Sequence, residues 1–151
     1  MSDPPELTPS ERETLLQVAV GAIRTPLETG QPLRVDATHY SSALQRETAS
    51  FVTLLAEEKL RGCCGSVLPR EPMVESVARS ATIAAFEDPR FPPVEAHELP
   101  QLQVQISLLS HLLPLHHRDE ADLLAQLRPG TDGLVLRIQS HEGVFLPAVW
   151  E

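Results

Sequence analysis

The chain of 151 residues is about as long as one globular domain, and its composition, 42% hydrophobic and 22% charged, excludes a disordered protein. With 12 Lys and Arg against 21 Asp and Glu, the formal net charge of −9 disfavours nucleic-acid partners, and four Phe, one Tyr and one Trp are too few for a base-stacking surface. No apolar run approaches the roughly 18 residues of a membrane helix, and the first six residues lack the order of a signal peptide, so we expect a cytoplasmic protein without a membrane partner.

The first predicted element is a helix from about Pro9 to Ile23. Thr8 is suited to be its N-cap, with Pro9 at the first helical position and Glu11 placed to complete a capping box. Apolar residues then recur at helical spacing. Pro26 and the glycine and proline that follow it are typical of a loop, so we expect the helix to end before them.

The next predicted elements are a β-hairpin and a second helix. Residues 50–55 are rich in β-forming side chains, residues 57–59 form a charged turn, and residues 60–67 make the second arm, which carries Cys63 and Cys64. From Met73 to Phe86 apolar and small residues recur at intervals of three and four, which predicts a buried helix.

The second half of the chain contains a proline-rich loop and further strands. Residues 88–93 hold three prolines and cannot continue the helix. Alternating apolar residues predict a strand over 102–108, and the following segments predict a short helix over 119–127, a turn over 128–133 and a strand over 134–138. A final hairpin is expected to turn through 140–143, with its second arm at 144–146. The expected fold class is α+β, a largely antiparallel sheet packed by helices, in a single domain over 1–151.

Several of these segments resemble the AMMECR family, and they occur in the family's order. The hallmark Leu-Arg-Gly-Cys-Ile-Gly is similar to Leu60–Gly65, with Cys64 in the place of isoleucine. The other similar segments are residues 51–54, 84–93, 98–99, 104–109, 129–134 and 145–150. The resemblance implies a two-subdomain α+β protein of the kind called system protein A of the AmmeMemoRadiSam gene group, with Memo-like and radical-SAM proteins as partners. Family members usually continue into further C-terminal helices, so relative to them the chain is C-terminally short.

Cys63 is the candidate functional residue, and two interpretations of it stay open. Gly62 before it gives the backbone freedom to approach a ligand closely, and Arg61 is expected on the same strand face, where it would favour a thiolate. Cys63 would then be a nucleophilic or redox thiol. Alternatively it is a small buried side chain in a strand with a bulge. Cys64 should point to the opposite face, into the core.

The candidate binding residues belong to two segments that we expect to lie against one another. They are Leu60, Gly62 and Gly65 in the first segment, and Asp88, Arg90 and Phe91 in the second. We expect Asp88 and Arg90 to form a carboxylate–guanidinium pair that pins the proline loop, or else a polar recognition edge beside Cys63. Two further acidic residues of the similar segments, Glu98 and Asp132, are interpreted as turn residues.

The sequence contains no motif that predicts a metal or a cofactor. His111, His116 and His117 fall on an expected loop without an ordered set of carboxylates, so we expect a solvated segment and no metal site. Cys-x-x-Cys, phosphate-binding glycine and His-Glu-x-x-His motifs are absent from the sequence. We expect no zinc, haem or flavin.

Two hypotheses of function follow. The first is a binding or accessory component that uses the Leu60–Gly65 segment and the Asp88–Pro93 loop together with Memo-like and radical-SAM partners. The second is a cysteine-dependent enzyme in which Cys63, assisted by Arg61, acts on a small molecule or a protein side chain. The first is preferred because no general base is identifiable near Cys63 in the sequence.

Overall fold

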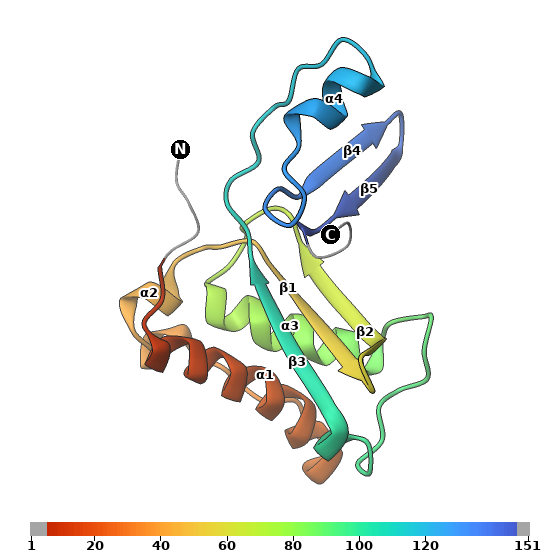
Figure 1. Ribbon diagram of the computed structural model, residues 1–151. Helices are drawn as coiled ribbons and strands as arrows, with labels where there is room; N and C mark the ends of the chain where they lie inside the picture. Colours follow the sequence, from red (N-terminus) through yellow and green to blue (C-terminus); the bar gives the residue numbers. More distant parts are fainter. Residues whose placement is uncertain (1–5, 148–151) are drawn as a thin grey trace. The chain divides into compact units, whose positions relative to one another are not determined.

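The computed structural model describes residues 6–147, and these fall into two compact units divided between Leu112 and Leu113. Figure 1 shows the elements in chain order. The first unit contains α1 (Pro9–Thr29), η1 (Ala37–His39), α2 (Ser42–Gln45), β1 (Ser50–Ala56), β2 (Lys59–Ser66), α3 (Met73–Phe86), η2 (Leu99–Gln101) and β3 (Leu102–Leu108). The second contains α4 (Glu120–Gln126), β4 (Leu134–Ile138) and β5 (His141–Phe145). The mixture of helices with antiparallel sheets confirms the predicted α+β class, and the two units agree with a two-subdomain architecture.

Helix α1 begins as the sequence predicts but ends six residues later. Both bonds of the capping box are present, from Thr8 N–H to the Glu11 carboxylate and from Glu11 N–H to the Thr8 hydroxyl. The prediction that the helix ends at Ile23 is wrong, since it continues through Pro26 to Thr29. Pro26 has no N–H for the carbonyl of Ala22, but the hydroxyl of Thr82 on α3 lies 3.3 Å from that carbonyl and 3.0 Å from the carbonyl of Ala78, so the two carbonyls share its one proton. The shared Thr82 hydroxyl thus gives the carbonyl that proline leaves free a tertiary partner, and the helix stops only at Gly30 in the left-handed region.

The first unit is built on a three-stranded antiparallel sheet in the order β2-β1-β3. The hairpin predicted around the charged turn is confirmed, with Glu57 and Glu58 both at positive φ in a tight connection. The predicted helix over 73–86 and strand over 102–108 are confirmed at the same bounds. Helices α1 and α3 lie on one side of this sheet (Figure 1).

Strand alternation determines which side chains face those helices. Along β1, Ser50, Val52 and Leu54 are buried, and they pair with Ser66, Cys64 and Gly62 on β2. Side chains at the intervening positions, among them Cys63, therefore point to the other face of the sheet. The core consists of the helix-facing residues of β1 together with apolar residues of α1 and α3, including Leu15, Ile23, Val74, Val77 and Ala81.

The second unit is a short helix followed by a two-stranded hairpin. Asp119 caps α4 through its side chain, which agrees with the predicted helix over 119–127. The prediction that the last hairpin turns through 140–143 is wrong. The turn consists of Gln139, at a φ of 55°, and Ser140, so β5 already begins at His141. A two-residue turn lets the backbone pairing start immediately after it, whereas the sequence interpretation placed Gly143 in the turn because of its residue type.

None of the helices between residues 6 and 147 combines the length and the apolarity that crossing a membrane requires.

Candidate functional site

The two segments singled out by sequence meet in the first unit. The backbone N–H of Cys63, in the middle of β2, donates to Oδ2 of Asp88 at 3.1 Å. Asp88 is the second residue after the end of α3, and β2 packs against that helix. The expectation that the Leu60–Gly65 strand and the Asp88–Pro93 loop lie against one another is therefore confirmed. Their functional roles stay predictions.

Asp88 is the residue that joins the loop to the sheet. Its side chain is 4% exposed, and both of its oxygens are used. Oδ1 accepts from Nε and the backbone N–H of Arg90, at 3.0 and 3.1 Å, while Oδ2 accepts from Nη2 of Arg90 at 2.8 Å as well as from Cys63. The Arg90 guanidinium, with help from the backbone donors, holds the pKa of Asp88 well below its usual range. The carboxylate–guanidinium pair expected to pin the proline loop is confirmed.

Arg61 is bound by a second carboxylate. Its Nε and Nη2 donate to the two oxygens of Glu98 at 2.9 and 3.1 Å, and its side chain is 12% exposed. Glu98 also accepts from the backbone N–H of Glu95 at 2.8 Å. The Arg61 guanidinium lowers the pKa of Glu98. Glu98 therefore does more than form a turn: it anchors the far end of the same loop to β2.

The two guanidiniums are brought together by an aromatic ring. The Cζ atom of Arg61 lies 6.0 Å from the centre of the Phe91 ring, and that of Arg90 lies 5.5 Å from it. Both distances fall within the range of cation–π attraction. Phe91 itself is partly buried. The result is a cluster, which we call the Cys63 cluster, made of Arg61, Cys63, Asp88, Arg90, Phe91 and Glu98.

Arg90 is joined to Cys63 through Asp88, whose Oδ2 accepts from both Nη2 of Arg90 and the backbone N–H of Cys63. The pKa of Arg90 is raised above its usual value, chiefly by its bond to Asp88. The spacing of the sequence suggested Arg61 as the cation that assists Cys63. In the structure the guanidinium of Arg61 is bound to Glu98. The Arg90 side chain is 55% exposed, so it also forms the solvent-facing edge of the cluster.

Cys64 points to the opposite side of β2. It packs against the hydrophobic core under α3, as expected for a residue in the place of isoleucine. Burial raises the pKa of its thiol. Both cysteines are free and of intermediate exposure, and strand alternation gives them different surroundings.

The glycines of the hallmark segment are needed for packing. A Cβ on Gly62 would lie 2.0 Å from the carbonyl oxygen of Ala84 on α3, and a Cβ on Gly65 would lie 2.3 Å from the carbonyl oxygen of Ser50 on β1. Both residues thus allow β2 to approach neighbouring backbone. Leu60 is 40% exposed at the start of the segment.

Sequence reasoning missed the partnership of Arg61 with Glu98. The only signal in the sequence was that Glu98 lies in a segment similar to the family. Asp132, by contrast, accepts the backbone N–H and the guanidinium of Arg128, which fits its interpretation as a turn residue in the second unit.

No His, Cys, Asp or Glu side chains within residues 6–147 are grouped so that three of them could hold a metal ion. His111, His116 and His117 lie in an exposed segment without regular structure, as expected. Of the similar C-terminal segment, residues 148–150 lie outside the described residues.

Comparison with known proteins gives matches along most of the chain. The AMMECR1 family model matches residues 16–151. A protein of Methanothermobacter thermautotrophicus is 34% identical over 95% of this chain and 74% of its own length, and one of Aeropyrum pernix is 34% identical over 97% and 64%. The crystal structure of an uncharacterised protein from Pyrococcus horikoshii superposes with a TM-score of 0.83 at 32% identity, over 91% of this chain and 69% of that one.

Proposed function

Because this chain belongs to the AMMECR1 family, we propose that it is a binding or accessory component whose recognition site is the Cys63 cluster, and that it acts with Memo-like and radical-SAM partner proteins. The observation that carries the proposal is the state of Arg90. Its side chain is 55% exposed, yet its guanidinium is fixed by two bonds to a buried carboxylate. An exposed donor group held in one orientation loses little freedom on binding, and this favours recognition.

The charges of the cluster indicate what it recognises. Arg61 and Arg90 are each paired with one carboxylate, so the four charged groups sum to zero. A strong anion site would need uncompensated cations. What remains for a ligand is the exposed side of the Arg90 guanidinium, whose Nη1 forms no hydrogen bond to another side chain in the part of the chain that the structure describes. Such a site fits acceptor-rich, neutral groups, and the carbonyl oxygens of a polypeptide segment are the commonest of these.

A cysteine-dependent enzyme is the second candidate. The observation in its favour is that Cys63 and the Arg90 guanidinium share one partner, since Oδ2 of Asp88 accepts from the backbone N–H of Cys63 and from Nη2 of Arg90. Arg61, the assisting residue first considered, is bound to Glu98 and would act by positioning. The nearest carboxylate is a poor general base, because the pKa of Asp88 is held far below neutrality and its oxygens already accept four hydrogen bonds.

Titration of the intact protein with purified Memo-like and radical-SAM proteins tests the proposal. Replacing Arg90 by Lys keeps the charge but removes the two-point bond to Asp88, and should weaken partner binding about tenfold or more. Arg79→Lys is the matched control, because Arg79 pairs with Glu71 on the surface of α3 outside the cluster. Thermal midpoints of both variants separate lost recognition from lost folding.

Three results would decide the outcome. Loss of binding in Arg90→Lys but not in Arg79→Lys, at equal stability, supports the recognition site. Binding that is equal in all three proteins, or absent in the unmodified protein, overturns it. Turnover of a small molecule that is abolished by Cys63→Ser while partner binding is unchanged would favour the enzyme.

A further inference from the structure

The two edges of the first sheet differ in how their backbone is protected. Edge strand β2 is covered, since Asp88 occupies the outward N–H of Cys63 and the loop after α3 lies against it. Edge strand β3 has no such cover within the described residues of the first unit. Its sequence from Leu102 to Leu108 contains no charged residue and no proline, and its pairing with β1 is regular, without a bulge. The usual devices that block an edge strand are therefore missing from β3.

The register identifies the backbone groups on this open edge. Leu109 N–H donates to the carbonyl of Ala49, one step beyond the pair Ser50 and Leu108. In an antiparallel ladder, hydrogen-bonded pairs alternate with pairs that are not bonded to each other. Counting back from Leu109, the residues whose N–H and C=O point away from β1 are Val104, Ile106 and Leu108, together with Leu102, whose N–H is already used by the carbonyl of Leu99. No hydrogen bond from the outward groups of the other three residues is present within residues 6–147.

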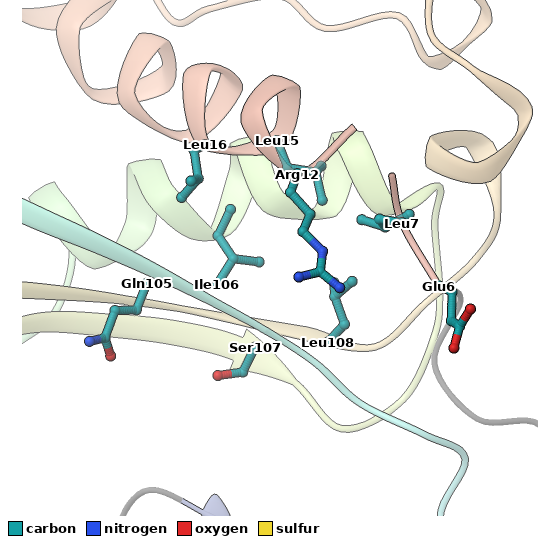
Figure 2. Close-up of a pocket in the computed structure, with 9 residues that line it drawn as sticks. All are labelled: Glu6, Leu7, Arg12, Leu15, Leu16, Gln105, Ile106, Ser107 and Leu108. Atoms are coloured by element: carbon teal, nitrogen blue, oxygen red, sulfur yellow. The ribbon is translucent and has the colours of Figure 1, made fainter. Parts of the chain in front are cut away.

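A groove of about 660 Å³ runs along this edge, between β3 and the first turns of α1, and its lining is mostly apolar with Glu6, Arg12, Gln105 and Ser107 among it (Figure 2). Its walls carry Leu15 and Leu16 from α1 and Ile106 and Leu108 from β3. The guanidinium of Arg12 reaches down from α1 toward β3 in Figure 2. Within residues 6–147, Arg12 takes part in no ion pair.

We propose that the open edge of β3 binds an extended polypeptide segment of a partner protein as a fourth strand. Its backbone pairs with the outward groups of Val104, Ile106 and Leu108, and alternate apolar side chains fill the groove. An acidic side chain of the segment meets Arg12. Strand addition of this kind derives affinity from main-chain hydrogen bonds and specificity from pockets for every second side chain.

The charges favour a different protein over a second copy of this chain as the occupant. A second β3 would bring no acidic residue to Arg12, because Leu102–Leu108 has none. It would also bring two chains of net charge −9 together. This edge is the opposite one from the Cys63 cluster, so the proposal does not depend on the proposed function.

Selection of random twelve-residue peptides by display on the intact protein tests the proposal, with the recovered peptides then synthesised. The expected peptides have apolar residues at every second position and one acidic residue. Arg12→Glu should weaken their binding about tenfold or more. The matched control Arg24→Glu makes the same charge change on α1 outside the groove and should leave binding unchanged. Methylation of the peptide nitrogens that face β3 should abolish binding.

Peptides that lack this pattern, or that bind the Arg12→Glu protein equally well, would overturn the proposal, as would a selection that enriches nothing. A concentration-dependent dimer that Leu16→Glu breaks would show that a second copy occupies the edge. Peptides whose binding is lost when Arg90 is substituted, but not when Arg12 is, would bind at the Cys63 cluster, and this result would likewise count against the proposal.

Discussion

Replacing Gly62 by Ala should destabilise the first unit strongly, and the structure sets the size of the effect. The new Cβ would lie 2.0 Å from the carbonyl oxygen of Ala84, whereas close carbon–oxygen contacts are about 3.3 Å. The last turn of α3 or the strand must therefore move by about 1.3 Å. The obstacle is helix backbone and not the end of a flexible side chain, so we expect a cost near the upper end of overpacking, about 3 kcal/mol.

The same displacement should reach the candidate site. Asp88 follows α3 by two residues and accepts the N–H of Cys63, the neighbour of Gly62. A shift of the helix end would lengthen this bond. Gly21→Ala is the matched control, since its Cβ would lie 3.4 Å from the end of the Leu33 side chain, an ordinary contact. Within α1 that change should stabilise the protein by about 0.5–1 kcal/mol.

Urea denaturation and thermal unfolding of both variants measure these effects. For a chain of this length a loss of about 3 kcal/mol lowers the thermal midpoint by roughly 6–12 °C. Amide hydrogen exchange at Cys63 should become faster in Gly62→Ala only. If Gly62→Ala unfolds at the midpoint of the unmodified protein, the close approach of β2 to α3 is wrong, and with it this explanation of the glycine.

Three further predictions concern single side chains. Asp88→Asn should cost about 1–3 kcal/mol at neutral pH. Because the folded pKa of Asp88 is lowered, its contribution is complete above the unfolded pKa of about 4 and is lost as the pH falls below that value. Unfolding free energies between pH 7 and pH 2 should therefore converge for the two proteins, and parallel curves would contradict the assignment. Cys63 should react with iodoacetamide faster than Cys64, so Cys63→Ser should remove the faster of the two alkylation reactions. Cys64→Ile should leave both the alkylation rate of Cys63 and the thermal midpoint of the protein nearly unchanged. A Cys63 that does not react with iodoacetamide would end the case for a reactive thiol. Thr82→Val should lower the free energy of unfolding by about 1 kcal/mol, because it removes the hydroxyl that donates to the carbonyl Pro26 leaves free. Thr82→Ser is the control, since it keeps the hydroxyl. Equal urea midpoints for the Val and Ser variants would refute this role of Thr82.

Much of the local structure follows from the sequence, because its signals act over a few residues. The capping box of Thr8 and Glu11 marks the start of α1, and periodicity alone places α3 and β3 at their observed bounds. Strand alternation separates the surroundings of Cys63 and Cys64 before any coordinates are known. The family resemblance adds the meeting of the hallmark segment with the proline loop.

Contacts between residues distant in the chain decided the rest. Pro26 is a helix breaker by its own chemistry, yet α1 continues through it, and Thr82, 56 positions later on another helix, places a hydroxyl beside the carbonyl that proline leaves free. Arg61 binds Glu98, 37 positions later, and no spacing rule indicates that pairing. The openness of the β3 edge depends on the order of strands in the sheet. Local sequence thus determines which elements form, whereas partner choice and edge exposure arise only when distant segments pack together, because long-range hydrogen bonds and charges leave no periodic signature in the chain.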